Sequence, residues 1–301
     1  MSALLLAGPT AVGKSAIALL LAEKLGGEIV SVDSMQVYRG MDIGTAKPAP
    51  ADRTRVPHHL VDVVDLKESF DAAQFVELAR RAVADIQSRG RLPILCGGTG
   101  LYFKAFLEGL GQAPPADAAL RAVLVTTPLP ELLRELAERD PVTYERIDRQ
   151  NPRRVVRAIE VIRLTGKPFS AQRAVWQTST LNPQPSTCHI GLTRSPADLH
   201  RRIAARVDTM FRQGWVAETE QLLQRGLAEN QTAMQALGYR QIVEHLRGKR
   251  SLAETIELVK LRTRQFAKRQ MTWFRRQLAL TWVDLEPQDS AAAVAKRIAG
   301  L

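Results

Sequence analysis

Eight consecutive residues near the N-terminus match the pattern G-x-x-x-x-G-K-[ST]; they are Gly8, Pro9, Thr10, Ala11, Val12, Gly13, Lys14 and Ser15. The apolar residues 3–7 before them are typical of a buried strand, and residues 16–25 after them favour a helix. This order of strand, glycine-rich turn and helix predicts a phosphate-binding P-loop. Backbone N–H groups and the helix N-terminus would surround a di- or triphosphate, and Lys14 would add a full positive charge. The Ser15 hydroxyl is the predicted ligand for Mg²⁺.

Length and composition indicate a soluble globular protein. The 301 residues are 45% apolar and 24% charged, which allows one large domain or two smaller ones. No segment is apolar for long enough to span a membrane, and the P-loop begins too early for a signal peptide to precede it. Cys96 and Cys188 lie far apart and outside any Cys/His cluster, as expected of buried thiols in a reducing cytoplasm. We expect a cytoplasmic monomer, because no long exposed apolar stripe is evident.

The positive charge of the chain is unevenly distributed. The net charge is +11, but residues 1–110 carry 12 Lys/Arg against 12 Asp/Glu. Residues 111–184 carry 11 against 8, and residues 185–301 carry 19 against 11. This excess beyond the P-loop third favours a polyanionic partner larger than a nucleotide, although a generally basic surface would give the same count.

The order of predicted elements indicates an α/β fold, a P-loop NTPase-like parallel sheet flanked by helices, with an inserted all-helical domain. Strands are predicted at residues 28–32, 59–64, 92–96, 188–192 and 280–283. Helices are predicted at residues 71–89, 197–213, 215–225, 235–246 and 251–276. Residues 117–175 are also predicted to be almost entirely helical. Proline-containing breaks at 112–115 and 181–185 predict a core domain of residues 1–110 and 185–301 and an inserted helical domain of residues 111–184.

Two strand ends carry candidate chemistry. Where P-loop kinases usually hold Mg²⁺ with a second acid, the strand at 92–96 is followed by Gly97-Gly98-Thr99-Gly100. Glycines there would let backbone approach a ligand and Thr99 would donate a neutral hydrogen bond, or the segment is a tight turn before a helix. Asp33 follows the strand at 28–32 and could bind metal, accept a proton or cap a helix. Gln36, three residues on, could bind a purine edge.

Several longer strings carry a resemblance to a known family. They are GPTAVGKS, VDSMQVYRGMDIGTAKP, PHHLVD and GGTGLYFKAFLEGL, followed by QNPRR at 150–154, LGYRQ at 237–241 and KRQMTW at 268–273. In this order and spacing the chain resembles the bacterial tRNA dimethylallyltransferases, also called tRNA isopentenyltransferases, over nearly its whole length. The resemblance implies transfer of a dimethylallyl group from dimethylallyl diphosphate to N6 of the adenosine 3′ of the anticodon, with release of diphosphate. The implied partners are dimethylallyl diphosphate and the anticodon stem-loop of tRNA.

The resemblance also implies roles for residues near the P-loop. Lys14, Ser15-bound Mg²⁺ and Thr99 would stabilise the departing diphosphate, and Asp33 would accept a proton from the adenine amine. Arg206 falls at the edge of the apolar stripe formed by Leu199, Ile203, Val207 and Met210, and it matches a family arginine. We therefore expect Arg206 to clamp the diphosphate, with snorkelling at a helix edge as the alternative.

The tRNA surface is predicted to be broader. Between residues 258 and 276 the chain carries seven Lys/Arg and no acids, and Lys260, Arg264, Lys268 and Arg275 would share one helical face opposite Val259, Phe266 and Trp273. Such an unpaired stripe favours phosphate contacts. Arg121 lies outside these strings but also matches a family position near the substrate. The predicted tRNA-binding residues are therefore Asp33, Ser34, Met35, Gln36, Thr99, Arg121, Gln150, Asn151, Pro152, Arg153, Arg154, Gly238, Tyr239, Arg240, Lys268, Arg269 and Arg275.

Two other functions remain open from the residues alone. A P-loop kinase could phosphorylate a small metabolite under a helical lid, but the glycine-threonine turn and the later basic bias speak against it. An adenylate isopentenyltransferase making a free cytokinin nucleotide would not need the basic helix. No Cys/His pairs follow Val283, so the zinc finger of eukaryotic relatives is not expected.

Overall fold

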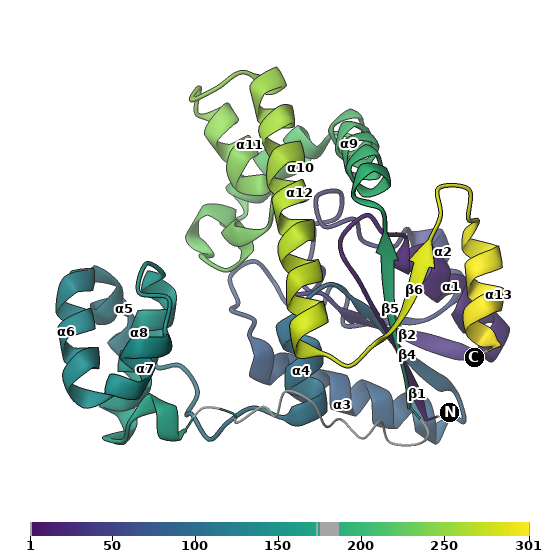
Figure 1. Cartoon of the computed structure of the whole chain (residues 1–301). Coiled ribbons are helices and arrows are strands. Elements are labelled where there is room, and N and C mark those ends of the chain that lie inside the picture. The colour runs from purple at the N-terminus through teal and green to yellow at the C-terminus, as the bar shows by residue number, and fades with distance from the viewer. Residues whose placement is uncertain (1, 173, 175–186, 301) are drawn as a thin grey trace. The chain divides into compact units, whose positions relative to one another are not determined.

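The computed structural model describes residues 2–172, 174 and 187–300. These residues form two compact units, one within Met1–Phe106 and Thr178–Leu301 and the other within Leu107–Gln177 (Figure 1). The break predicted at residues 181–185, and with it the predicted boundary after residue 184, lies outside the described residues.

A parallel sheet forms the centre of the first unit. Within the described residues it has six strands in the order β3-β2-β4-β1-β5-β6, with every neighbouring pair parallel. Their bounds are β1 Ala3–Ala7, β2 Gly27–Val32, β3 His58–His59, β4 Leu92–Gly97, β5 Thr187–Arg194 and β6 Thr281–Leu285. The middle strands are mostly apolar and almost wholly buried, as expected for parallel strands covered on both faces.

The first unit also contains helices, several of which flank the sheet (Figure 1). In the described residues they are α1 Lys14–Leu25, α2 Pro50–Arg55, α3 Ala72–Ser88, α4 Gly100–Glu108, α9 Pro196–Arg212, α10 Trp215–Gln224, α11 Tyr239–Leu246, α12 Leu252–Gln277 and α13 Ala291–Ala299. The chain moves outward from β1 to β2 and returns from β3 to β4, so right-handed crossovers place α1 and α3 on opposite faces. Helix α13 packs beside α1 (Figure 1). The predicted fold class, a parallel sheet flanked by helices, is confirmed.

The structure departs from the predicted elements in two places. The strand predicted at residues 59–64 is reduced to β3 and one isolated bridge between Tyr38 and Val64. The backbone of Leu60 and Asp62 is left-handed, with φ of 61° and 58°, and an extended strand cannot pass through such residues. Helix α13 was not predicted at all, although Ser290 caps its N-terminus in the expected way.

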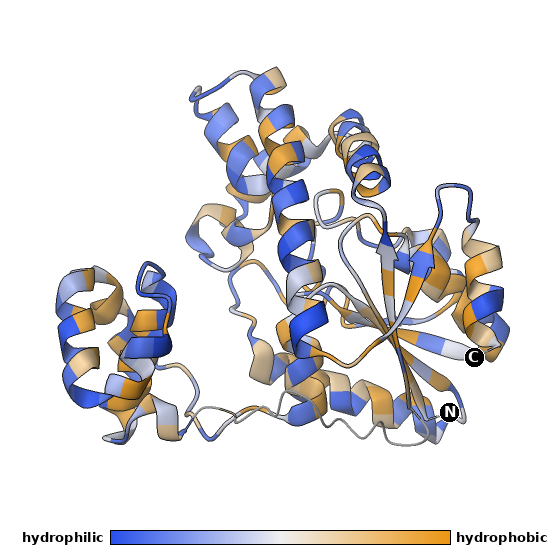
Figure 2. Cartoon of the chain, in the orientation of Figure 1, coloured by the Kyte–Doolittle hydropathy of each residue, from blue (hydrophilic) through white to orange (hydrophobic). Residues whose placement is uncertain are grey.

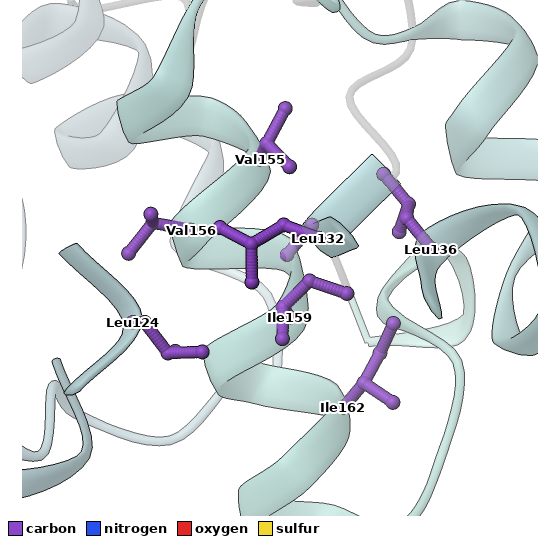
Figure 3. Packing of buried hydrophobic residues seen from close by; sticks show 8 residues of the cluster. Leu124, Leu132, Leu136, Val155, Val156, Ile159 and Ile162 are labelled. Atoms are coloured by element: carbon purple, nitrogen blue, oxygen red, sulfur yellow. The ribbon is translucent and has the colours of Figure 1, made fainter. Parts of the chain in front are cut away.

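The second unit is all-helical in its described residues. It contains α5 Ala118–Thr126, α6 Leu129–Arg139, α7 Pro141–Arg146 and α8 Pro152–Thr165, followed by a 3₁₀ turn at Phe169–Ala171. Its core is made by α5, α6 and α8 and consists of Leu124, Leu132, Leu136, Val155, Val156, Ala158, Ile159 and Ile162 (Figure 3). This unit therefore has a hydrophobic core of its own. In neither unit does a described helix have the length and apolarity needed to cross a membrane.

Candidate functional site

A cavity of about 430 Å³ opens at the carboxyl ends of β1, β2 and β4. This is the edge of a parallel sheet at which ligands bind in α/β folds. Polar groups of the P-loop and the β2 and β4 ends line it, together with apolar side chains of α9 and α12; among the lining residues are Lys14, Ser15, Asp33, Ser34, Met35, Gln36, Thr99, Ile203, Arg206, Val207 and Phe266. The structure thus brings together the four predicted catalytic residues, Lys14, Asp33, Thr99 and Arg206.

The P-loop adopts a tightly curled backbone. Gly8 and Gly13 have φ of 155° and 113°, and Ala11 between them has φ of 64°. At Gly8 a side chain is excluded on steric grounds as well, because a Cβ there would lie 2.8 Å from the carbonyl oxygen of Leu192. The ammonium of Lys14 bends back over the loop and donates to the carbonyl oxygens of Gly8 and Pro9 at 2.8 and 2.7 Å. The loop and its lysine are therefore preshaped around a small anion site.

Burial lowers the pKa of Lys14 to about 8, while Cys96 and Asp33 raise it and Arg206 lowers it further. Desolvation disfavours the charged amine until an anion arrives. Burial also raises the pKa of the Cys96 thiol to about 11, so this cysteine is a neutral thiol beside the site.

Two arginines that the sequence analysis missed hold the loop from outside. Arg194 at the end of β5 donates from Nε to the carbonyl oxygen of Val12 at 2.9 Å, and Arg202 on α9 donates from Nε to that of Ala11 at 2.9 Å. Arg202 lies one helical turn before Arg206, so the same helical spacing that singled out Arg206 could have found it.

Arg206 takes up the predicted place facing the P-loop. It is half-buried and lines the main cavity as well as an adjoining hollow of about 360 Å³, which it shares with Lys14, Ser15 and Arg202. Burial lowers the pKa of its guanidinium, with Asp33 acting in the opposite direction. Lys14, Arg202 and Arg206 thus place three cations around the P-loop. Such a site favours a ligand with more than one negative charge.

Asp33 is fixed by a turn, and because the next helix, α2, begins only at Pro50, Asp33 does not cap a helix. Its Oδ1 accepts hydrogen bonds from the backbone N–H groups of Met35 at 2.8 Å and Gln36 at 3.3 Å. Among the described residues no hydrogen bond occupies Oδ2. The carboxylate is therefore oriented through one oxygen and can accept a proton on the other.

Thr99 is oriented in a complementary way. Its Oγ1 accepts from the backbone N–H of Ser34 at 3.1 Å, so its own hydroxyl proton remains for a ligand. Gln36, by contrast, is occupied: its Oε1 accepts from Ser31 at 2.8 Å, and its Nε2 donates to the carbonyls of Thr45 and Ala46. In this structure Gln36 holds a neighbouring loop, which speaks against its predicted contact with a purine edge.

The glycines after β4 make room for protein, and this corrects the interpretation that they make room for a ligand. A Cβ on Gly98 would lie 2.4 Å from Nε2 of Gln270, and one on Gly100 would lie 2.2 Å from the Trp273 ring. Both contacts come from α12, which packs against this turn, and α4 starts at Gly100.

The oxygen atoms of Ser15 and Asp33 could hold a hard cation such as Mg²⁺ only together with a bound phosphate group. Ser15 is exposed, no hydrogen bond between described residues occupies its hydroxyl, and Asp33 lines the same cavity. The described residues contain no group of three or more His, Cys, Asp or Glu that could hold a metal. An Mg²⁺ ion here would draw most of its ligands from diphosphate oxygens and water, as is common for this ion.

Helix α12 presents a basic face, but with differences from the expected stripe. Lys268, Arg269 and Arg275 are exposed, and Figure 2 shows hydrophilic residues along much of the helix. Lys260 is ion-paired with Asp208 and Glu257 at 2.8 and 2.9 Å, so the prediction that it is unpaired was wrong. Phe266, expected to pack inward, is 37% exposed at the cavity rim, because Val259, Ala267, Gln270 and Phe274 form the buried face instead.

The LGYR segment is mostly structural. Tyr239 is completely buried and donates from its hydroxyl to Glu218 at 2.7 Å. Gly238 is buried too, and a Cβ on it would lie 2.0 Å from the Trp215 ring. Burial speaks against the predicted tRNA contacts of these two residues. Arg240 is exposed and pairs with Glu244 at 3.3 Å.

Of the residues predicted to bind tRNA in the second unit, some make structural contacts and others are exposed. Arg121 and Arg157 both pair with the buried Glu160 at 2.5 and 2.6 Å, which gives Arg121 a structural role. Asn151 caps α8 by accepting from the N–H of Arg154 at 3.4 Å, with Pro152 at the first helical position. Gln150, Arg153 and Arg154 are exposed at this helix start.

The sheet and the loop after β1 together define a P-loop protein, with a cationic cavity at the end of β1. The "IPP transferase" family model matches residues 36–277. The chain belongs to the IPP transferase family.

Its relatives agree over almost the whole chain. A tRNA dimethylallyltransferase of Geobacter metallireducens is 49% identical over 282 residues, covering 92% of this chain and 90% of the relative. That of Pelotomaculum thermopropionicum is 43% identical and covers 98% of this chain and 95% of its own. The crystal structure of the full-length tRNA isopentenylpyrophosphate transferase of Bacillus halodurans aligns with a TM-score of 0.70 at 39% identity, covering 100% of this chain and 96% of that one.

A eukaryotic dimethylallyltransferase acting on tRNA has the same fold. It aligns with a TM-score of 0.73 at 29% identity, covering 94% of this chain and 73% of that one. None of these four relatives is a kinase or an adenylate isopentenyltransferase.

Proposed function

We infer that this chain transfers a dimethylallyl group from dimethylallyl diphosphate to N6 of the tRNA adenosine 3′ of the anticodon, releasing diphosphate. The observation that carries this proposal is the pairing, in one cavity, of a cationic P-loop with an oriented carboxylate at Asp33 and a neutral donor at Thr99. A phosphoryl-transfer enzyme would be expected to place a second metal-binding acid after β4, and Thr99 stands there instead. We further propose that the enzyme uses Mg²⁺ and acts as a cytoplasmic monomer.

The geometry supports a direct displacement. The adenine amine attacks the allylic carbon, the carbon–oxygen bond to diphosphate breaks, and the amine proton passes to Oδ2 of Asp33. Lys14, Arg206 and the Thr99 hydroxyl hold the negative charge that grows on the departing diphosphate. Mg²⁺ on the Ser15 hydroxyl would add charge compensation at the same group. Because the exocyclic amine is a weak nucleophile, its positioning supplies much of the rate.

The adenine reaches this carboxylate only after leaving its stack in the anticodon loop. Extrusion of a base costs a few kcal/mol, which contacts in the pocket recover. Ser34, Met35 and the apolar side chains of α9 lie beside Asp33 in the cavity and are positioned for those contacts.

The test uses dimethylallyl diphosphate labelled in its carbon chain. Unmodified tRNA should gain label in proportion to diphosphate released, while AMP offered at equal concentration should not. Labelled AMP with unlabelled tRNA would identify an adenylate isopentenyltransferase instead. A parallel reaction with γ-labelled ATP and small-molecule acceptors should transfer no phosphate, and transfer there would overturn the proposal in favour of a kinase.

A further inference from the structure

One side chain of α12 bonds to both segments that form the diphosphate side of the cavity. Gln270 is 8% exposed and lies on the buried face of the helix. Its Oε1 accepts from the backbone N–H of Thr10 at 2.9 Å, and its Nε2 donates to the carbonyl oxygen of Gly98 at 2.9 Å. Because an N–H can only donate and a carbonyl can only accept, these partners allow one orientation of the amide.

These two bonds connect the helix to the ends of adjacent strands. Thr10 belongs to the P-loop that follows β1, Gly98 follows β4, and β1 pairs directly with β4. The next residue, Thr99, carries the hydroxyl that faces the cavity. Gln270 therefore sets the spacing between the loop that holds a diphosphate and the hydroxyl that donates to it. The glycine at position 98 is what allows the amide so close.

The exposed side of the same helical turn carries Lys268 and Arg269, the residues predicted to contact tRNA phosphates. Over one turn, an α-helix behaves as a rigid body, so RNA that holds these cations in place also holds Gln270 in place. We propose that Gln270 is a positioning residue that couples RNA binding on the basic face of α12 to diphosphate binding in the P-loop. This inference rests on the proposed function, because it takes tRNA as the ligand of that face.

The coupling works through preorganisation. With RNA bound, α12 is fixed, and its amide keeps Thr10 and Gly98 in the geometry that a diphosphate needs. Diphosphate binding then costs less free energy, because the site is already ordered when the ligand arrives. By linkage, diphosphate must strengthen RNA binding by the same factor.

The experiment measures the Kd of inorganic diphosphate with Mg²⁺, using the full chain with and without a saturating anticodon stem-loop RNA. In the unmodified enzyme we expect the Kd to fall about tenfold when RNA is present, within the usual range of coupling between sites. Gln270→Met keeps a similar volume but loses both bonds, and its Kd should change by less than about twofold on adding RNA. Gln265→Met, an exposed glutamine on the same helix, should retain the full effect.

A merely structural role for Gln270 would lower thermal stability and leave the RNA effect intact. Retention of the full effect in Gln270→Met, or its absence from the unmodified enzyme, overturns the proposal. Should Gln270→Met fail to fold, the near-isosteric Gln270→Glu decides, since it can accept from Thr10 but as a carboxylate cannot donate to Gly98. It should lose the coupling, and full coupling in that variant also overturns the proposal. If labelled donor modifies tRNA while Gln270→Met still couples, only this inference fails; if tRNA gains no label, the proposed function itself fails.

Discussion

Two charged side chains in the cavity have opposite tasks in the proposed reaction. Asp33 has to take up a proton, whereas Lys14 has to keep one. The structure serves both needs by local means, because backbone N–H groups orient one oxygen of Asp33 and two loop carbonyls hold the Lys14 ammonium. Each task can be tested by a single substitution.

Asp33→Asn keeps an oxygen that can accept from the N–H groups of Met35 and Gln36 but removes the proton acceptor. We expect the single-turnover rate to fall about 10²–10⁴-fold, the usual contribution of a general base, with RNA affinity nearly unchanged. Rapid-quench transfer of labelled dimethylallyl groups measures the rate. Asp65→Asn, at an exposed ion pair with Arg39, is the control. An unchanged rate in Asp33→Asn would show that another group takes the proton.

The lowered pKa of Lys14 predicts how diphosphate affinity depends on pH. Its pKa is lowered to about 8 in the free site, and bound diphosphate favours the charged form and raises it. Affinity should therefore be constant well below pH 8 and fall above it, by up to about tenfold per pH unit, because the neutral amine must first gain a proton. Calorimetric titration with inorganic diphosphate from pH 7 to 9.5 measures this.

Lys14→Arg provides the comparison, because a guanidinium stays charged over this range. Its affinity for diphosphate should lack the fall that begins near pH 8, whatever its absolute value. Equal pH profiles for both proteins would assign the fall to the ligand.

At the scale of single residues, local spacing predicted much of the site. The P-loop follows from its spacing alone, and Arg206 follows from its place on a helical wheel. The roles of Arg194 and Gln270 do not follow in this way, because each is defined by a partner about 170 to 260 residues away in sequence. The same limit applies to Tyr239, which was predicted from its family string to contact tRNA but donates its buried hydroxyl to Glu218.

At the scale of elements, α12 serves two purposes with two faces. Its buried face packs on the P-loop and on the turn after β4, and its exposed face carries Lys268, Arg269 and Arg275. The sequence predicted the helix, its exposed Lys268 and Arg275 and its buried Val259, but it misassigned Phe266 and Lys260. Periodicity alone could not show that a polar Gln270 is buried or that Asp208, on α9, neutralises Lys260. Strand prediction failed at residues 59–64 for a different reason, since left-handed backbone at Leu60 leaves no periodic signal.

Neutralising Lys268 and Arg269 together, by substitution with Gln, should weaken RNA binding and reduce its salt dependence. Each lost phosphate contact lowers the slope of log Kd against log salt by about 0.7–0.9, so the double variant should lose about 1.5. Fluorescence anisotropy of a labelled anticodon stem-loop between 50 and 300 mM salt measures the slope. Lys260→Gln removes a cation that is already paired and should change it far less. Equal slopes in the double variant and the unmodified enzyme would mean that this face does not contact RNA.

At the scale of the whole molecule, the two units contribute different binding groups. The cavity and the cationic side chains that line it come entirely from the first unit, while Arg153 and Arg154 lie on a helix that packs in the second unit's own core. Separate cores allow one unit to be destabilised without changing the other. Destabilising the second unit should therefore leave diphosphate affinity unchanged but weaken RNA binding.

Ile159→Ala tests this division. Ile159 is fully buried in the core shown in Figure 3, and its truncation should cost that unit about 2–5 kcal/mol of unfolding free energy. Hydrogen exchange across α5 to α8 should accelerate, and RNA affinity should fall because α8 no longer presents Arg153 and Arg154 in a fixed place. The Kd for inorganic diphosphate should stay within about twofold of its original value, since every residue that lines the cavity belongs to the first unit. Val142→Ala, 52% exposed in the same unit, should leave both affinities unchanged. A parallel loss of diphosphate and RNA binding in Ile159→Ala would instead mean that the P-loop depends on the second unit for its shape.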